Sequence, residues 1–371
     1  MKILVRAPNW MGDAVMAIPA FEAIRARWPD AEIAMLGIAP IAGLLSGQSF
    51  ADRAIVFDRG GRHGGVGGRA RLAAELAQQH FDAAILLPNS FDAAWIAWRA
   101  HIPQRIGFAR DARGLLLTDA LVAPRSGEIP AHHSYYYLEL LRRAGWIDRL
   151  PDSLSTTLRV SAEARAAAEA ALVRAGARAR AANGAPDAAR SKPLRCAFAP
   201  GAAFGTAKRW LPSRFADLAS RLRAEWDADV ILFGAASDCD AANAIAARTG
   251  ESVINMAGKT SAAELPAFLA ACDVFIGNDS GASYVAAAVG SPVIAVYGPM
   301  PVEIAFPITP RLEIVRHPVS CSPCLLRDCP VDHRCMTRIE VDDVLSAAKK
   351  WLAQPNLASI AARDAGSVSG A

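Results

Sequence analysis

A glycine-bounded turn in the second half of the chain has the composition of a phosphate-binding loop. Residues 277–281 (GNDSG) lie between a buried apolar run at 274–276 and a small-residue helix expected over 282–289. Glycines let backbone amides approach a ligand closely, and helix N-termini favour anionic groups. Ligands of open parallel sheets bind at the carboxyl ends of the strands. The pattern therefore predicts either a site for a phosphate-bearing ligand or a plain piece of Rossmann-like scaffold.

Asp13 closes a polar turn, residues 8–13 (PNWMGD), that follows the first predicted strand. The turn lacks the G-x-G-x-x-G pattern of dinucleotide sites. Asp13 could cap the helix that follows it, which is a common role for an aspartate at a helix start. It could instead act as a general base that faces a ligand cleft. The pair His132 and His133 opens a later helix and is expected to be solvated.

Four of the seven cysteines cluster late in the chain, at Cys321, Cys324, Cys329 and Cys335. With His333 nearby, such a cluster could hold a zinc ion. Its C-x2-C-x4-C-x5-C spacing differs from that of a standard two-knuckle zinc site, so we expect a compact loop of reduced thiols and no metal. The odd total number of cysteines also argues against a disulfide framework.

Short apolar segments alternate with helical segments throughout the chain, and the motifs above lie at their ends. Strands are predicted at 2–7, 31–37, 53–57, 82–88, 196–200, 229–233, 253–256, 274–276 and 293–297. This alternation predicts an open parallel sheet in each half of the chain, and hence an α/β protein. A Gly- and Arg-rich stretch at 59–71 is expected to be a mobile loop that leads into a helix over 71–80.

The composition limits the classes of function. The net charge is +4 and the chain contains no block of Lys or Arg, which argues against nucleic acid as a partner and fits an anionic substrate or a membrane surface. No run of about 18 apolar residues occurs, and no signal peptide is evident. We therefore expect a cytoplasmic protein that can lie peripherally on a membrane.

The length of 371 residues favours two domains. We expect an N-terminal Rossmann-like domain over 1–180, a linker over 181–194, a C-terminal Rossmann-like domain over 195–354 and a disordered tail over 355–371. The linker carries Gly, Pro and Ser with little apolar bulk, and the tail has no strong periodicity.

Four blocks of the sequence, in this order, resemble glycosyltransferase family 9, the ADP-heptose:lipopolysaccharide heptosyltransferases. They are PNWMGD at 8–13, PNSF at 88–91 with RIGF at 105–108, PGA at 200–202 with AKRW at 207–210, and GNDSG at 277–281 running to YGP at 297–299. The cysteine-rich segment resembles that of the type II enzymes. The resemblance covers roughly residues 1–350, and the order and spacing of the blocks carry it.

The resemblance implies a GT-B fold, with two Rossmann-like domains whose parallel sheets face each other across a cleft. It also implies inverting transfer of L-glycero-D-manno-heptose from ADP-heptose to the first heptose of the lipid A–Kdo core. The expected partners are the nucleotide sugar, the lipopolysaccharide acceptor and the inner face of the inner membrane. No cofactor is implied. The D-x-D at 238–240 lies at a helix start, so we expect transfer without a metal ion.

By the same resemblance, Asp13 is the candidate base and Lys208 the candidate stabiliser of the departing diphosphate. A solvated loop lysine is the alternative interpretation of Lys208. The acceptor is expected in the N-terminal domain, near the motif residues of the first two blocks. These acceptor-binding candidates are Asn9, Trp10, Gly12, Asn89 and Arg105.

The donor is expected in the C-terminal domain. Gly201 and Thr206 belong to the loop that would contact phosphate. A carboxylate pointing inward would repel phosphate, so Asp279 is assigned to sugar hydroxyls, while Ser280 and Gly281 are left for the diphosphate.

Three further donor-binding candidates have plain alternatives. Asp238 could accept from ribose hydroxyls or cap a helix, and Met256 could lie against adenine or belong to the core. Tyr284 stands where the family often has histidine, so a proton-transfer role there is in doubt, while a hydrogen bond to the sugar remains possible.

Two rival functions remain. One is another family 9 transferase, such as a type I or type III heptosyltransferase with a different acceptor. The other is a nucleotide-sugar-binding protein without catalysis, which would have no use for both Asp13 and Lys208.

Overall fold

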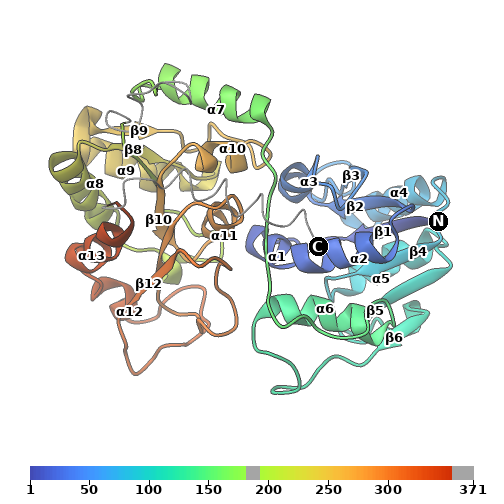
Figure 1. Ribbon diagram of the computed structural model, residues 1–371. Helices are drawn as coiled ribbons and strands as arrows, with labels where there is room; N and C mark the ends of the chain where they lie inside the picture. The colour runs from blue at the N-terminus through green and yellow to red at the C-terminus, as the bar shows by residue number, and fades with distance from the viewer. Residues whose placement is uncertain (181–192, 353–371) are drawn as a thin grey trace. The chain divides into compact units, whose positions relative to one another are not determined.

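The computed structural model describes residues 1–180 and 193–352, which form two compact units (Figure 1). Unit 1 comprises Met1–Thr156 with Glu303–Ala305, and unit 2 comprises Thr157–Val302 and the chain from Phe306 onward. Each unit is built on a six-stranded parallel sheet with helices on its faces. The predicted α/β class with two Rossmann-like domains is therefore confirmed.

Unit 1 carries its sheet in the order β3-β2-β1-β4-β5-β6. The strands are β1 (Lys2–Arg6), β2 (Glu32–Gly37), β3 (Arg53–Val56), β4 (Ala83–Leu86), β5 (Gln104–Phe108) and β6 (Asp119–Leu121). The helices are α1 (Met11–Met16), α2 (Ile18–Arg27), α3 (Ala39–Leu45), α4 (Gly65–Ala77), α5 (Phe91–Arg99), η1 (Gly114–Leu116) and α6 (His133–Arg143).

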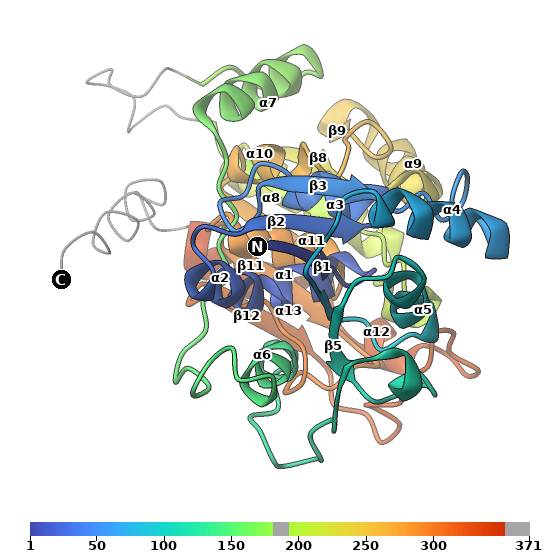
Figure 2. The same ribbon diagram turned by 90° about the vertical axis from the view of Figure 1, so that its right-hand side faces the viewer.

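Alternate residues of the central strands of unit 1 face opposite sides of the sheet, and both sides are buried. Leu4 packs in one apolar cluster with residues of α4 and α5, such as Leu72 and Ile96. Ile3 and Val5 point to the other side, where α2 packs against α6. Burial on both faces explains why these strands are continuous apolar runs rather than alternating ones. Figure 2 shows the unit from a second direction.

Unit 2 repeats the arrangement, with the sheet order β12-β11-β10-β7-β8-β9. The strands are β7 (Arg195–Ala199), β8 (Asp229–Leu232), β9 (Val253–Asn255), β10 (Val274–Asn278), β11 (Val293–Tyr297) and β12 (Leu312–Arg316). The helices are α7 (Ala162–Arg174), η2 (Thr206–Lys208), α8 (Pro212–Trp226), η3 (Ala236–Asp238), α9 (Cys239–Thr249), η4 (Gly250–Ser252), α10 (Leu265–Ala270), α11 (Gly281–Ala288), α12 (Arg334–Thr337) and α13 (Val341–Leu352).

The two sheets have the same strand order when each is counted from its own first strand. In both sheets, the first strand lies between the second and the fourth. The chain therefore adds strands on one side of the first strand and then on its other side. These switch points are β1 with β4 in unit 1, and β7 with β10 in unit 2. Ligands of doubly wound sheets bind outside the carboxyl ends of the strands at such a point. The topology therefore assigns one candidate binding position to each unit.

The boundary predicted at residue 180 is too late, because α7 belongs to unit 2. The helix packs against α10, and Glu169 on α7 forms an ion pair with the fully buried Arg195 of β7. These contacts hold the alanine-rich helix on the second sheet. The predicted linker at 181–194 lies mostly outside the described residues, and the predicted tail at 355–371 lies wholly outside them.

The stretch at 59–71 is not a loop throughout, since α4 begins at Gly65. One of its glycines serves close packing. A Cβ atom on Gly68 would lie 2.3 Å from the carbonyl carbon of His63, so only glycine lets the helix pack on the turn before it. In the described part of the chain, no helix is both long enough and apolar enough to cross a bilayer.

Candidate functional site

The switch point of unit 2 is tied together by one buried amide side chain. Asn278, the last residue of β10, is fully buried. Its Oδ1 accepts from the backbone N of Trp210 at 3.0 Å, and its Nδ2 donates to the carbonyl oxygen of Pro200 at 2.7 Å. Asn278 thereby fixes both ends of the loop that follows β7, which is the loop that carries Lys208.

Lys208 and Asp279 form an ion pair at this switch point. Lys208 Nζ lies 2.6 Å from Asp279 Oδ2, with the two side chains 12% and 7% exposed. Burial raises the pKa of the Asp279 carboxyl, and the nearby Lys208 ammonium lowers it in part. The ammonium also lies 5.0 Å from the centroid of the Phe204 ring. The two residues were predicted as separate donor contacts, and the structure brings them together.

Tyr284 is buried in α11 at 4% exposure and is hydrogen-bonded to the hydroxyl of Tyr297. Tyr297 is in turn hydrogen-bonded to Asp279. The hydroxyl predicted to reach a sugar is thus engaged with another phenol, because α11 turns this face toward β11. Ser280 is the N-cap residue of α11 and Gly281 its first residue, which fits backbone contacts to an anion.

Gly201 is required by the carboxylate of Asp238. A Cβ atom at position 201 would lie 2.2 Å from Asp238 Cγ. Asp238 Oδ2 accepts from the backbone N of Ala235 at 3.0 Å and so closes the turn of η3, whereas its side chain makes no capping hydrogen bond to α9. Its Oδ1 is buried and has no hydrogen-bond partner among the described residues. One oxygen therefore caps the turn, while the other remains a hydrogen-bond acceptor beside Gly201.

The cysteine-rich segment supports the same loop. Thr206 donates its hydroxyl to Asp328 Oδ1 at 2.7 Å, and the carbonyl oxygen of Arg327 accepts from the backbone N of Ala207 at 2.9 Å. A Cβ atom at Gly205 would lie 2.1 Å from that same Arg327 oxygen. Thr206, predicted to bind phosphate, is thus engaged in holding the loop.

Met256 and the cysteines are the remaining candidates of unit 2 that the sequence analysis named. Met256 is 6% exposed and follows β9, as expected of a core methionine. All seven cysteines are free thiols, and Cys329 Sγ accepts from the backbone N of His333 at 3.3 Å. Over residues 1–180 and 193–352, no group of three or more His, Cys, Asp or Glu is arranged to hold a metal ion.

The switch point of unit 1 presents Asp13 in the first turn of α1. Trp10, and not Asp13, occupies the N-cap position, so the helix-capping interpretation of Asp13 does not hold there. Asp13 is partly buried, and α1 packs against α6. Burial raises the pKa of the Tyr137 hydroxyl on α6, and the Asp13 carboxylate raises it further. Asp13 therefore lies close enough to α6 to act on the hydroxyl of Tyr137.

The histidine pair is not solvated as expected. His132 is buried, and its Nδ1 accepts from the backbone N of Ser134 at 3.3 Å, which caps α6. His133 Nε2 lies 3.1 Å from the hydroxyl of Tyr137, and its ring stacks on that of Tyr136. Burial lowers the pKa of His133. The apolar face of α6 pulls the pair inward, which the polar sequence alone did not indicate.

Two buried arginines hold the loops around Asp13, and the sequence analysis missed both. Arg6 donates to Asn9 Oδ1 at 2.6 Å, and Arg113 donates to Asn89 Oδ1 at 3.4 Å. Asn89 in turn donates to the hydroxyl of Tyr136 at 2.8 Å. Burial lowers the pKa of Arg6 and of Arg113 to about 10 in each case. An arginine within the apolar strand at 2–7 was the available signal.

The other acceptor candidates of unit 1 differ in exposure. Trp10 is half exposed, and Gly12 lies beside Asp13 in α1. Arg105 donates to the carbonyl oxygens of Leu116 at 2.7 Å and of Ile102 at 2.5 Å. Its guanidinium therefore holds the turns around β5, which is a structural task.

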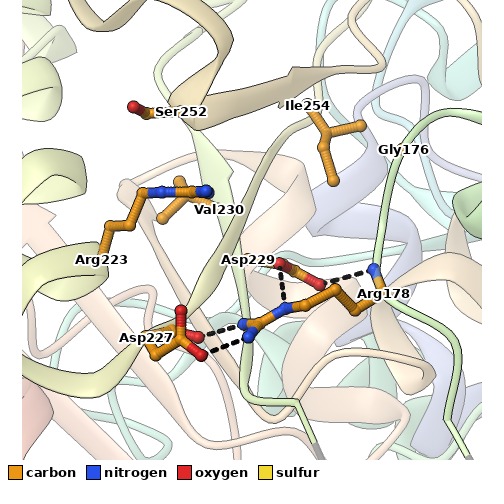
Figure 3. Close-up of a pocket in the computed structure, with 8 residues that line it drawn as sticks. All are labelled: Gly176, Arg178, Arg223, Asp227, Asp229, Val230, Ser252 and Ile254. Atoms are coloured by element: carbon orange, nitrogen blue, oxygen red, sulfur yellow. Dashed lines mark hydrogen bonds and ion pairs between the residues drawn. The ribbon is translucent and has the colours of Figure 1, made fainter.

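Unit 2 also has a small cavity of about 150 Å³, and Figure 3 shows the residues that line it. It borders Asp229, the first residue of β8, and Ser252, which precedes β9. Arg178 donates from its backbone N and its Nε to Asp229, both at 2.9 Å, and also pairs with Asp227. This network is at the amino ends of the strands, so it anchors the segment after α7 and is no substrate site.

Comparisons with known proteins agree on one family. The family described as Glycosyltransferase family 9 (heptosyltransferase) matches residues 69–334. The chain is 34% identical to lipopolysaccharide heptosyltransferase 2 of Salmonella typhimurium, covering 85% of this chain and 88% of the relative.

Solved structures give the same result. The ADP-heptose lps heptosyltransferase II of E. coli is 29% identical with a TM-score of 0.77, covering 95% of this chain and 99% of that one. An E. coli heptosyltransferase solved with ADP has a TM-score of 0.67 at 16% identity, covering 94% and 99%, and supports the fold alone.

Proposed function

Because the chain belongs to glycosyltransferase family 9, the heptosyltransferases, we propose that it transfers heptose from ADP-heptose to the first heptose of the lipopolysaccharide inner core. The observation that supports the proposal is the set of ionisable groups at the two switch points. Unit 2 has an ammonium at a glycine-bounded loop, and unit 1 has a partly buried carboxylate.

The donor binds to unit 2 in this proposal. Its diphosphate lies near Lys208 and the backbone of Ser280 and Gly281, where the ammonium and the start of α11 favour anions. The ribose reaches Asp238, whose buried Oδ1 has no partner in the described chain. In this pose Asp279 accepts hydrogen bonds from hydroxyl groups of the heptose.

The acceptor binds to unit 1, and Asp13 removes the proton from its attacking hydroxyl. As the acceptor oxygen forms its bond to the anomeric carbon, the bond from that carbon to the β-phosphate oxygen breaks. The proton passes to the Asp13 carboxylate, and the electron pair leaves with ADP. Attack from the face opposite the leaving group inverts the anomeric centre.

Lys208 stabilises the departing diphosphate. Charge builds on the β-phosphate as the glycosidic bond breaks, and a fixed ammonium in a partly buried site is well suited to stabilise it. The proposal assigns this task to Lys208 and the amides of the adjacent turn. It predicts turnover that continues after chelator treatment.

A coupled ADP-release assay tests the function. Purified protein is given ADP-heptose together with acceptors that bear no heptose, one heptose or two heptoses. We expect rapid ADP release only with the one-heptose acceptor. Release with the heptose-free acceptor would favour a type I enzyme, release with the two-heptose acceptor would favour a type III enzyme, and ADP-heptose binding without release would favour a non-catalytic binding protein.

Peripheral membrane contact is the last part of the proposal, because the acceptor is a lipid. Unit 1 carries exposed apolar side chains such as Leu115, which is 98% exposed in η1, and Val122, which follows β6. The net charge of +4 fits an anionic surface. Co-sedimentation with phosphatidylglycerol vesicles should fall for Leu115→Ser, whereas equal binding of the variant and the unmodified protein would remove Leu115 from the contact.

A further inference from the structure

Two buried tyrosines form a hydrogen-bonded chain that ends at Asp279 of the Lys208–Asp279 pair. Tyr297 ends β11 and is 1% exposed, and Tyr284 lies in α11 at 4% exposure. The strand register brings Tyr297 to Asp279, since Asn278 pairs with Val296 and the backbone N of Asp279 donates to the carbonyl oxygen of Val296 at 3.0 Å. The sheet itself therefore brings one phenol to the carboxylate.

The direction of the hydrogen bonds follows from the donors available. An ionised carboxylate only accepts, so Tyr297 must donate its single hydroxyl proton to Asp279. The Tyr297 oxygen can then only accept from Tyr284, with which it is also hydrogen-bonded. The result is a chain that runs from Tyr284 to Tyr297 to Asp279 and ends at the ammonium of Lys208, 2.6 Å from Asp279 Oδ2.

We propose that Tyr297, supported by Tyr284, is a positioning residue that fixes Asp279 and through it aims Lys208 at the donor diphosphate. The inference rests on the proposed function and adds two residues to it. The Tyr284 hydroxyl, which the sequence suggested for the sugar, is hydrogen-bonded to Tyr297 instead, so in this inference both tyrosines act through Asp279 and Lys208.

The arrangement lets Lys208 serve the donor without leaving Asp279. An ammonium has three N–H donors, and one of them suffices for the carboxylate. The remaining two can reach phosphate oxygens, while the Phe204 ring, with its centroid 5.0 Å from Nζ, limits where the side chain swings. Holding the lysine in advance reduces the rotamer entropy lost when the donor binds.

The chain also keeps Asp279 ionised where burial alone opposes ionisation. Burial raises the pKa of this carboxyl, while the hydrogen bond from Tyr297 and the Lys208 ammonium both lower it. If the phenol is removed, the carboxyl loses one of its two stabilising partners. A protonated Asp279 would no longer hold the ammonium electrostatically, and Lys208 would be free to move.

The test is a double-mutant cycle of Tyr297→Phe with Lys208→Ala, read out as ADP affinity by calorimetry and as donor KM. We expect Tyr297→Phe alone to weaken ADP binding about tenfold, the size typical of a lost hydrogen bond to a charged group. In the Lys208→Ala background, the same substitution should change ADP affinity by less than about twofold, because the lysine it positions is gone.

A merely structural tyrosine would give a different result. Its removal would weaken binding by the same factor with and without Lys208, and such additivity would overturn the inference. Tyr284→Phe is the second variant. It should weaken ADP binding by roughly threefold, again only when Lys208 is present, and it decides the question should Tyr297→Phe fail to fold. Unchanged ADP affinity in a folded Tyr284→Phe would then overturn the inference.

Tyr135→Phe is a matched control, since Tyr135 is another buried tyrosine and belongs to unit 1. It should leave ADP affinity unchanged. The two proposals fail in different ways. No heptose transfer by the unmodified protein would contradict the proposed function, whereas transfer by the unmodified protein with an additive cycle would contradict only the positioning role of the tyrosines.

Discussion

The two switch points share one topology and differ in charge. Unit 1 places the Asp13 carboxylate near an aromatic group on α6, with buried arginines bracing the surrounding loops. Unit 2 places the Lys208 ammonium against Asp279 at a glycine-bounded loop, braced by the neutral amide of Asn278. Identical strand order fixes where a ligand binds, and a handful of side chains decide what happens to it.

In the proposed reaction, this difference separates two tasks. A base must be reachable by an acceptor hydroxyl, and it gains from an environment that keeps its proton affinity high. A leaving-group stabiliser must be fixed in place before charge develops. Asp13 lies in the first turn of a short helix, while Lys208 is held at both its ammonium and its loop. Substitutions at Asp13 should therefore affect turnover alone, whereas substitutions at Lys208 should affect both donor binding and turnover.

The largest effect is expected for Asp13→Asn. Loss of a general base should lower kcat by about 10²- to 10⁴-fold. ADP affinity should stay the same, because Asp13 belongs to unit 1 and the donor is assigned to unit 2. Asp82→Asn is the control, since Asp82 directly precedes β4 and so lies at the amino end of a central strand of the same sheet. Near-normal turnover of Asp13→Asn would remove this carboxylate from the mechanism and end the division of labour.

Lys208→Ala should come next and should impair both binding and turnover. Removing a fixed charge from the leaving group is expected to cost about 10²- to 10³-fold in kcat/KM. ADP binding by calorimetry should weaken in parallel, in contrast to Asp13→Asn. Lys349→Ala, which removes an exposed lysine side chain on α13, serves as the control. If ADP affinity is unchanged in Lys208→Ala, the ammonium does not hold the diphosphate.

At both switch points, the sequence indicated the local motifs but not the residues that brace them. The glycine loops, Asp13 and Lys208 could be named as candidates from the sequence because each motif is local and follows a recognisable apolar strand. The bracing residues were missed because their partners are distant in sequence: Arg113 and Asn89 are 24 residues apart, and Asn278 reaches Trp210 across 68. The Lys208–Asp279 pair joins two loops that only the sheet order brings together.

The domain boundary was misjudged for a related reason. The alanine-rich α7 has too little apolar periodicity to show which sheet it covers, and its attachment depends on the ion pair between Glu169 and Arg195. Such pairing of separate segments is not written in local composition. Residues whose task is local were thus predictable, while residues that join segments were not.

Gly201→Ala is expected to have an intermediate effect, confined to unit 2. The new Cβ atom would lie 2.2 Å from Asp238 Cγ, so the carboxylate must turn away and lose its hydrogen bond to the backbone N of Ala235. The free energy of unfolding should fall by about 1–3 kcal/mol. ADP affinity should fall as well, since the glycine loop lies at the proposed donor site.

Gly60→Ala is the matched glycine substitution in unit 1, because a Cβ atom there would meet nothing within 4 Å. Chemical denaturation should find it as stable as the unmodified protein. Equal stability of Gly201→Ala and the unmodified protein would mean that Asp238 moves freely, and that its carboxylate is not tied to the glycine loop.

The smallest effect is a pH dependence of opposite sign in the two units. In unit 2, burial raises the pKa of Asp279, so the folded protein holds this proton more tightly than the unfolded chain does. Its contribution to stability is fully present below the unfolded pKa and is lost as pH rises through the folded pKa. In unit 1, hydrogen bonds from Arg142 and Arg143 lower the pKa of the buried Glu139. Its contribution is present above the unfolded pKa and is lost as pH falls through the folded one.

Two variants measure these opposite signs by chemical denaturation at pH about 7.5 and about 5, near which the carboxyl groups begin to titrate. The stability of the unmodified protein relative to Asp279→Asn should increase on acidification, and its stability relative to Glu139→Gln should decrease. The sign of each difference is the readout, because burial and the two arginines shift the two carboxyl pKa values in opposite directions. A shift of the same sign for both variants would show that Lys208 outweighs burial at Asp279. Asp279 and Glu139 would then no longer differ in how their carboxylates are held, because a carboxylate whose pKa is lowered by its partner behaves as an ordinary ion pair.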